Sequence, residues 1–287
     1  METKETKATV NNVSKKPVAA KKKSQGFTGI KSAWIILVIC LVLAIVVYQF
    51  VLGSPSNFAG GDRSGKALNM LGTVYKGGFV VPIIWTMLFA DLALTFERFL
   101  ALKTAFGKMS LDKFVKQTKD CLQKNDLDGV LKVCDKQGGS VANVINATIV
   151  KYREVEADNT LTKEQKVLSL QKTLDEATAL EMPTLQMNLP ILATIVTLGT
   201  LTGLLGTVLG MIRSFQALAA GGGGDSLALS TGISEALVNT ASGIATSWLA
   251  VVFYNFYTNK IDKLTYALDE VGYSIAQTYE ANHTEEA

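Results

Sequence analysis

The chain is poor in charge and in the side chains that most catalytic and metal sites require. Asp, Glu, Lys and Arg make up 18% of its 287 residues, against roughly 25% in an ordinary soluble domain. One histidine and three widely spaced cysteines (Cys40, Cys121 and Cys134) argue against a histidine-based triad, a zinc site and a disulfide framework. The sequence has no phosphate-binding loop and no nucleophile elbow. We therefore expect neither an enzyme nor a cofactor or metal. The net charge of +3 is too small to predict nucleic-acid binding.

What the chain does have is long apolar runs. Hydrophobic residues make up 48% of it, and the mean hydropathy is +0.25. A helix of about 20 apolar residues crosses a hydrocarbon core of ~30 Å. Four stretches of suitable length carry little charge, and they predict transmembrane helices at about 34–53, 78–97, 190–213 and 229–257.

The first run, Trp34 to Leu52, has a secretory signal as its alternative reading. Lys21 to Lys23 precede it like the basic region of such a signal. The apolar part exceeds the usual length of about 7 to 15 residues and has no clear small-x-small cleavage site. We therefore predict a retained span.

The basic residues predict the orientation, because Lys and Arg near helix ends resist translocation. Eight Lys lie in 1–33, fourteen Lys and Arg in 97–189 and two in 254–287, whereas the loop after the first span has three. Both termini and the middle segment are therefore predicted to be cytoplasmic. The expected regions are a basic cytoplasmic tail 1–33, a transmembrane helix 34–53, an outer loop 54–77, a transmembrane helix 78–102, a cytoplasmic helical region 103–189, a transmembrane hairpin 190–257 and a cytoplasmic C-terminal helix or tail 258–287.

Helical periodicity recurs through 103–189, with a break at Gly138-Gly139 and an amphipathic helix predicted over Leu161 to Leu180. The predicted fold class is an all-α integral membrane protein, with four transmembrane helices and a cytoplasmic helical bundle.

The third span carries a stripe of small residues. Its glycines follow spacings of four, three and four, so they share one helix face, and such stripes let membrane helices approach closely. The glycines expected at helix contacts are Gly199, Gly203, Gly206 and Gly210, with Gly243 on the fourth span. Thr200, Thr202 and Thr207 lie in the same span and add hydroxyls.

The fourth span carries a polar line with an acid in it. Glu235, Asn239, Ser242 and Thr246 follow the same helical spacing, and Thr240 lies on a neighbouring small-residue line. An ionisable residue in a membrane helix is costly and usually faces a water-filled path or a partner. A hairpin centred near 221 or 222 would place Thr207 opposite Glu235 and Thr202 opposite Thr240. The pattern fits a proton relay or a small-cation site, and it equally fits a polar patch that only locks helices together.

These residues resemble the ExbB/TolQ/MotA proton-channel family, specifically its ExbB and TolQ branch. The resemblance extends from about Phe79 to Tyr266. The motifs that carry it are Gly203 to Ile212 in the third span, Gly232 to Leu237 with Thr240 and Val251 to Asn255 in the fourth, Glu97 to Lys103 at a helix exit, and the cytoplasmic patterns 125–134 and 170–192.

The resemblance implies a bacterial inner-membrane pentamer around the helices of an ExbD-like single-span partner with an essential membrane Asp. Such a complex uses proton-motive force to energise a TonB-like protein and outer-membrane transport, which would make the loop 54–77 periplasmic. Glu235, Thr207 and Thr240 fall on the family's channel-lining positions. Further lining is expected from Asn239, Ser242, Thr246, Thr200 and Thr202.

Three departures from the family stand out. Thr200 and Leu249 replace prolines that the family usually has, and the first span has no counterpart in a branch that typically has three spans. Asp91 is an extra acid in the second span, and we expect it to be interfacial rather than a second proton site. The alternatives are a TolQ-like subunit, a flagellar or gliding stator, and a non-conducting membrane scaffold; the ion could be a proton or sodium.

Overall fold

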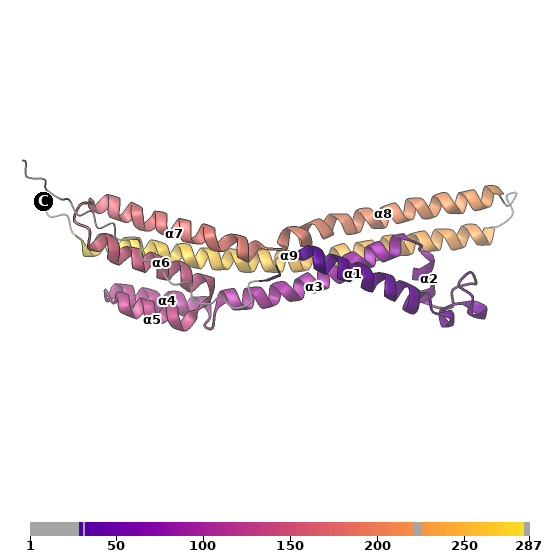
Figure 1. The fold of residues 1–287 in the computed structure, drawn as a ribbon. Coiled ribbons are helices and arrows are strands. Elements are labelled where there is room, and N and C mark those ends of the chain that lie inside the picture. Colours follow the sequence, from indigo (N-terminus) through magenta and orange to yellow (C-terminus); the bar gives the residue numbers. More distant parts are fainter. Residues whose placement is uncertain (1–28, 31, 221–225, 284–287) are drawn as a thin grey trace, which may run out of the picture.

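The computed structural model describes residues 29–30, 32–220 and 226–283, so most of the basic tail 1–33 and the glycine turn 221–225 lie outside the described residues. The chain forms an elongated rod of helices (Figure 1). Its elements are α1 (Ala33–Val46), η1 (Val47–Leu52), η2 (Pro55–Asn57), η3 (Ala59–Gly61), α2 (Met70–Lys76), α3 (Val80–Phe106), α4 (Leu111–Gln123), α5 (Leu127–Gln137), α6 (Gly139–Glu156), α7 (Lys163–Gln186), α8 (Leu189–Ala220) and α9 (Ser226–Asn282).

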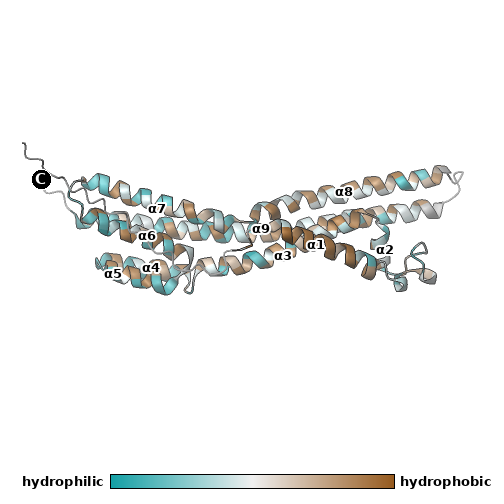
Figure 2. Ribbon diagram, in the orientation of Figure 1, coloured by the Kyte–Doolittle hydropathy of each residue, from teal (hydrophilic) through white to brown (hydrophobic). Residues whose placement is uncertain are grey.

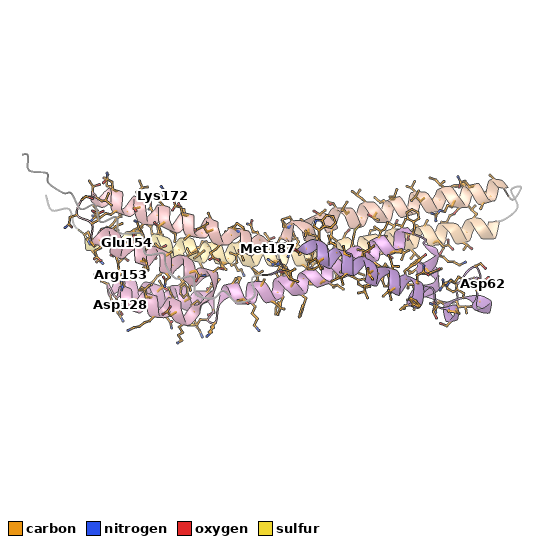
Figure 3. The ribbon with its side chains drawn as sticks, viewed as in Figure 1. Asp62, Asp128, Arg153, Glu154, Lys172 and Met187 are labelled. Atoms are coloured by element: carbon orange, nitrogen blue, oxygen red, sulfur yellow. The ribbon has the colours of Figure 1, made fainter. Side chains whose placement is uncertain are left out.

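Four of the described helices are long and apolar enough to cross a membrane, and they correspond to α1 with η1, α3, α8 and α9. This confirms the prediction of an all-α membrane protein with four spans. Figure 2 shows hydrophobic residues concentrated on α1 and hydrophilic ones frequent on α6 and α7. Asp62 marks one end of the rod, Lys172 lies toward the other, and Met187 lies between them at the α7–α8 joint (Figure 3). The rod thus divides into an apolar half and a polar half.

The first span packs mainly against α3, and most of its other side chains are exposed. Within α1 only Cys40 and Ala44 are buried, and these two small side chains let the helix approach its neighbour. Trp34 is 78% exposed, as expected for a side chain that meets lipid rather than protein. The helix continues as the π-helical turn η1 up to Gly53.

The segment between the first two spans contains a short helix that the sequence analysis treated as loop. Asn69 caps α2 by accepting a hydrogen bond from the Gly72 amide at 2.9 Å. Tyr75 on α2 stacks on Tyr48 of η1 with ring centroids 4.6 Å apart. Because of these contacts, α2 holds its last residue, Lys76, beside the membrane-spanning helices.

The polar half is a helical bundle, which we call the distal bundle, made of α4 to α7 and the C-terminal part of α9. Its core includes Phe114, Ile145, Leu170 and Leu264, all fully or almost fully buried. The predicted break between helices occurs where Gly138 and Gly139 adopt φ values of 64° and 77°, a region that favours glycine. The helix predicted over 161–180 is longer than expected. It begins with a capping box between Thr162 and Gln165 and ends at Gln186.

A buried ion pair joins the two halves of the rod. Arg98 is fully buried and donates to Glu97 through Nε and Nη2 at 2.6 and 2.5 Å. Arg98 Nη1 also donates to the Thr184 carbonyl at 3.3 Å. Glu97 accepts from the Ile30 amide at 2.8 Å and from Asn188 Nδ2 at 3.3 Å. The pair therefore connects the segment before α1, helix α3 and the α7–α8 joint.

Candidate functional site on the α8–α9 hairpin

Helices α8 and α9 pack through the glycines of the third span. A Cβ atom added at Gly203 would lie 3.1 Å from the Asn239 carbonyl oxygen and 3.2 Å from the Gly243 Cα. One added at Gly210 would lie 2.7 Å from the Ala236 Cβ. A side chain at either position would push the helices apart, so glycine here permits close backbone contact.

The predicted register of this hairpin is wrong by about one helical turn. Thr207 lies against Thr240, and the two hydroxyls are hydrogen bonded, whereas the sequence analysis placed Thr207 opposite Glu235 and Thr202 opposite Thr240. The reason is that α8 continues to Ala220 and α9 begins only at Ser226. The hairpin is therefore centred near residue 223, which moves every partner on α9 further along the chain.

The two threonines form a small hydroxyl cluster inside the hairpin. The Thr207 and Thr240 hydroxyls lie within hydrogen-bonding distance of the Gly203 carbonyl, at 3.3 and 3.1 Å, and Thr207 lies equally close to the Ala236 carbonyl, at 3.3 Å. A second hydroxyl pair lies further along, between Thr200 and Ser247 at 2.9 Å. Hydroxyls in this setting can exchange hydrogen-bond partners, because each one both donates and accepts.

Glu235 lies next to cations from two other elements. Its Oε1 is 4.0 Å from Lys76 Nζ, and the two side chains are 24% and 18% exposed. Arg213 of α8 also acts electrostatically on this carboxyl, while its guanidinium lies 5.5 Å from the ring centroid of Phe79. In the sequence, Lys76 is one of the three basic residues of the loop after the first span, and Arg213 lies in the third apolar run. Neither is near Glu235 in sequence, so only the fold brings them together.

In the polar line, Asn239 contacts both the α2–α3 junction and α8, where it packs against Gly206. Asn239 is 2% exposed and donates to the Gly77 carbonyl at 3.0 Å, while its Oδ1 has no hydrogen-bond partner among the described residues. Thr246 is buried and donates to the Ser242 carbonyl at 3.0 Å. Thr202 is half-buried. The predicted residues thus lie on both helices of the hairpin, and Asn239 joins them to the α2–α3 junction.

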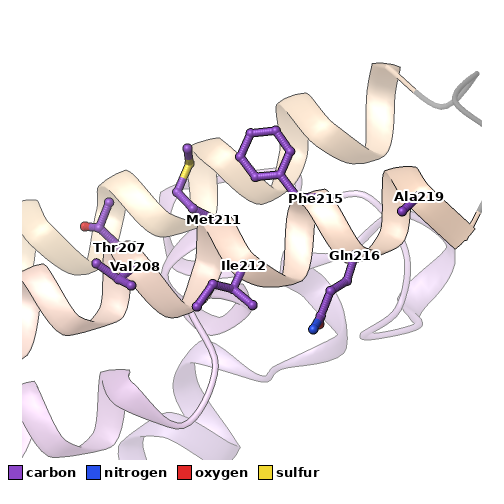
Figure 4. Close-up of a pocket in the computed structure, with 7 residues that line it drawn as sticks. All are labelled: Thr207, Val208, Met211, Ile212, Phe215, Gln216 and Ala219. Carbon is purple, nitrogen blue, oxygen red and sulfur yellow. The ribbon is translucent and has the colours of Figure 1, made fainter.

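An apolar groove begins at Thr207 and follows α8 away from the distal bundle (Figure 4). Its volume is about 630 Å³. It is lined by Thr207, Val208, Met211, Ile212, Phe215, Gln216 and Ala219. Thr207 thus belongs both to the end of the groove and to the hydroxyl cluster inside the hairpin. Within the described part of the chain, no group of three or more His, Cys, Asp and Glu is arranged to hold a metal ion.

The fold and this hairpin define a multi-pass, all-α membrane protein with an acid on a polar helix face inside the spans. Comparison with known proteins names the class further, since residues 142–270 match the MotA/TolQ/ExbB proton channel family. This stretch, somewhat less than half of the chain, is what resembles that family.

Named relatives agree with the family match. The chain is 37% identical to the biopolymer transport protein ExbB of Helicobacter pylori over 33% of this chain and 64% of that protein. It is 36% identical to the Tol-Pal system protein TolQ of Pseudomonas aeruginosa over 28% of this chain and 35% of that protein. A putative ExbB homolog of Methanothermobacter thermautotrophicus is 22% identical over 68% of this chain and 66% of its own length. Among these and two Synechocystis relatives, the matched stretches span 26% to 66% of the relatives' lengths.

Proposed function

We propose that the chain is an ExbB-like subunit of an inner-membrane motor, which converts proton-motive force into work on a TonB-like protein for outer-membrane transport. The observation that carries this proposal is Glu235, a half-buried carboxyl on a membrane-spanning hairpin. It precedes Thr240 on α9, and Thr240 is paired with Thr207 of α8. A charged group inside a membrane is costly, and it usually marks an ion path or a partner contact. The match of residues 142–270 to a family described as proton channels supports the ion path.

The proposed topology places both termini and the distal bundle in the cytoplasm. Of the 28 Lys and Arg, most lie in the N-terminal tail and in the segment 97–189 that forms most of the distal bundle. The loop 54–77 and α2 are then periplasmic. Glu235 and Lys76 lie toward that side, where protons enter under proton-motive force.

The proposed assembly is a ring of identical subunits, five by family resemblance, around an ExbD-like single-span partner. Helices α8 and α9 expose broad apolar surface that lipid can cover. The side chains that form it are Leu198, Leu201, Leu205, Leu237, Ile244, Trp248 and Val252. The groove on α8 supports a helical partner, because its lining is mostly apolar while Thr207 lies at one end. A partner helix seated there would bring a membrane Asp close to the hydroxyl pair.

The proposed mechanism couples the charge of Glu235 to helix position. Beside Lys76 the carboxylate is balanced by a cation; if a moving partner separates the two groups, low dielectric favours the neutral, protonated acid. Thr207 and Thr240 then supply hydroxyls for proton transfer toward the partner. Asn239, Ser242, Thr246, Thr200 and Thr202 are proposed as further lining of the path.

The test is proton flux and energised uptake by reconstituted complexes carrying Glu235→Gln or Thr207→Val. We expect both changes to abolish or strongly reduce flux while the complexes still assemble with partner. The matched control is Thr197→Val, since the Thr197 hydroxyl is exposed and donates only to the Thr194 carbonyl at 3.0 Å on the same helix. Full transport by Glu235→Gln would show that the carboxyl is structural, as would failure of all three variants to assemble.

The same complexes separate the alternatives. Identification of the single-span protein that co-purifies distinguishes an ExbB-like from a TolQ-like subunit or a stator. The absence of ion flux in the wild-type complex would favour a non-conducting scaffold.

A further inference from the structure

Asp91 is buried more completely than the sequence analysis expected. It lies on α3, and its side chain is 0% exposed within a single chain. The expected interfacial acid is thus covered by protein and not by lipid headgroups. Its neighbour Ala90 packs in one cluster with Cys40 of α1, Ile195 of α8 and Ala250 of α9, so three other helices enclose this part of α3.

Neither oxygen of Asp91 has a hydrogen-bond partner among the described residues. The nearby cation, Arg98, is already committed to Glu97 through two hydrogen bonds. One turn along α3, the Thr95 hydroxyl is also buried and unpartnered within the described chain. The Thr95 carbonyl accepts a hydrogen bond from the Tyr257 hydroxyl at 2.8 Å.

The titratable groups around Asp91 come from three helices. They are Glu97 and Arg98 on α3, Tyr257 on α9, which lies within electrostatic range of all three charged groups, and Cys40 on α1 in the adjoining cluster. None of them gives Asp91 a free positive partner. An ionised carboxylate without a cation or donors is very costly in a low-dielectric interior, and such a group takes up a proton instead.

We propose that Asp91 holds a proton in the resting protein and that, with the Thr95 hydroxyl, it forms a second proton-binding site, separate from Glu235. The proton-holding state follows from burial and contacts alone. The role of this site rests on the proposed function: within one subunit, Asp91 binds the proton after it has passed the region of Glu235.

The position of Asp91 suits that use. Buried polar residues of α9 run from Asn239, which donates to the Gly77 carbonyl, to Thr246, and one turn further Ala250 shares a packed cluster with Ala90 beside Asp91. Beyond Asp91 lie Tyr257 and the Glu97–Arg98 pair at the joint with the distal bundle. A small separation of α3 and α9 would admit water. The acid would then break its O–H bond and pass the proton to that water, becoming a carboxylate.

Infrared spectroscopy of the full chain labelled with carbon-13 in the Asp side-chain carboxyl tests the proton-holding state. Asp91 is the sole Asp in the four predicted spans. We expect a protonated-acid C=O band from Asp at pH 7 in the wild type, absent in Asp91→Asn and retained in Glu235→Gln. A wild-type spectrum with only carboxylate bands, or a band that persists in Asp91→Asn, would overturn the site without depending on any variant's activity.

Proton flux tests the use of the site. Asp91→Asn keeps the shape and neutrality of the acid but cannot exchange a proton, so we expect assembled complexes with flux as low as that of Glu235→Gln. Normal flux in Asp91→Asn, with the infrared band present in the wild type, would refute the relay while leaving the buried acid established. If Glu235→Gln itself retains flux, the proposed function fails, whatever the infrared result.

Discussion

Removing one member of the buried Glu97–Arg98 pair is predicted to destabilise the protein strongly. In Arg98→Leu, the Glu97 carboxylate loses two hydrogen bonds of 2.5 and 2.6 Å and remains 3% exposed. Breaking a buried ion pair by removing one partner costs about 3–5 kcal/mol. Glu97 keeps its bonds from the Ile30 amide and Asn188, so we expect the lower end of that range, about 3 kcal/mol.

The matched control is the exposed pair between Arg153 and Asp128 in the distal bundle. Their atoms are 2.5 Å apart, but the side chains are 42% and 76% exposed. Solvent screens such pairs, so Arg153→Leu is expected to cost at most about 1 kcal/mol. Both residues are labelled in Figure 3.

The assay is reversible unfolding by denaturing detergent, followed through helix content and the fluorescence of Trp34, Trp85 and Trp248. The double variant Glu97→Gln/Arg98→Leu removes the unpaired Glu97 carboxylate, so it should recover part of the stability that Arg98→Leu loses. If Arg98→Leu destabilises the protein no more than Arg153→Leu, the ion pair does not hold the two halves together as argued.

Two further predictions use the same preparation. For the hairpin register, cysteines at 207 and 240 should form a disulfide under mild oxidation, whereas cysteines at 207 and 235 should not. Gel mobility detects the disulfide in a background that lacks Cys40, Cys121 and Cys134. The opposite pattern would support the register predicted from the sequence. For pH dependence, burial raises the pKa of the Cys134 thiol from 9.0 to about 12, so between these values the unfolded chain releases a proton that the folded chain keeps. The stability of the distal bundle should therefore fall as pH rises from about 9 to about 12. Unfolding measured at each pH should show a shallower fall for Cys134→Ala.

The spans could be predicted because they depend on composition over about 20 residues. The 3.6-residue period likewise separated the exposed face of α8 from its glycine face, as the exposure of Leu201 and the burial of Gly203 illustrate. These properties are local, so no knowledge of the neighbouring helices was needed.

The errors arose where the answer depends on tertiary contacts. The hairpin register depends on how far α8 continues before the glycine turn, and apolar periodicity does not determine that end. Lys76 reaches Glu235 only because Asn69 caps α2 and Tyr75 stacks on Tyr48. The burial of Asp91 depends on the packing of α1, α8 and α9 around Ala90. The sequence around a single acid in a hydrophobic run does not show whether its side chain lies among lipid headgroups or in the protein interior.

Helix α9 has a mechanical consequence, because it continues unbroken for 57 residues from Ser226 to Asn282. At 1.5 Å per residue it is about 85 Å long, with Glu235 near one end and Tyr279 packed edge-on against Tyr152 near the other. A single rigid rod acts as a lever: a tilt of about 5° at the membrane end would displace the far end by about 7 Å. A small movement near Glu235 would thus become a larger displacement at the end of the distal bundle, where a bound protein would be moved.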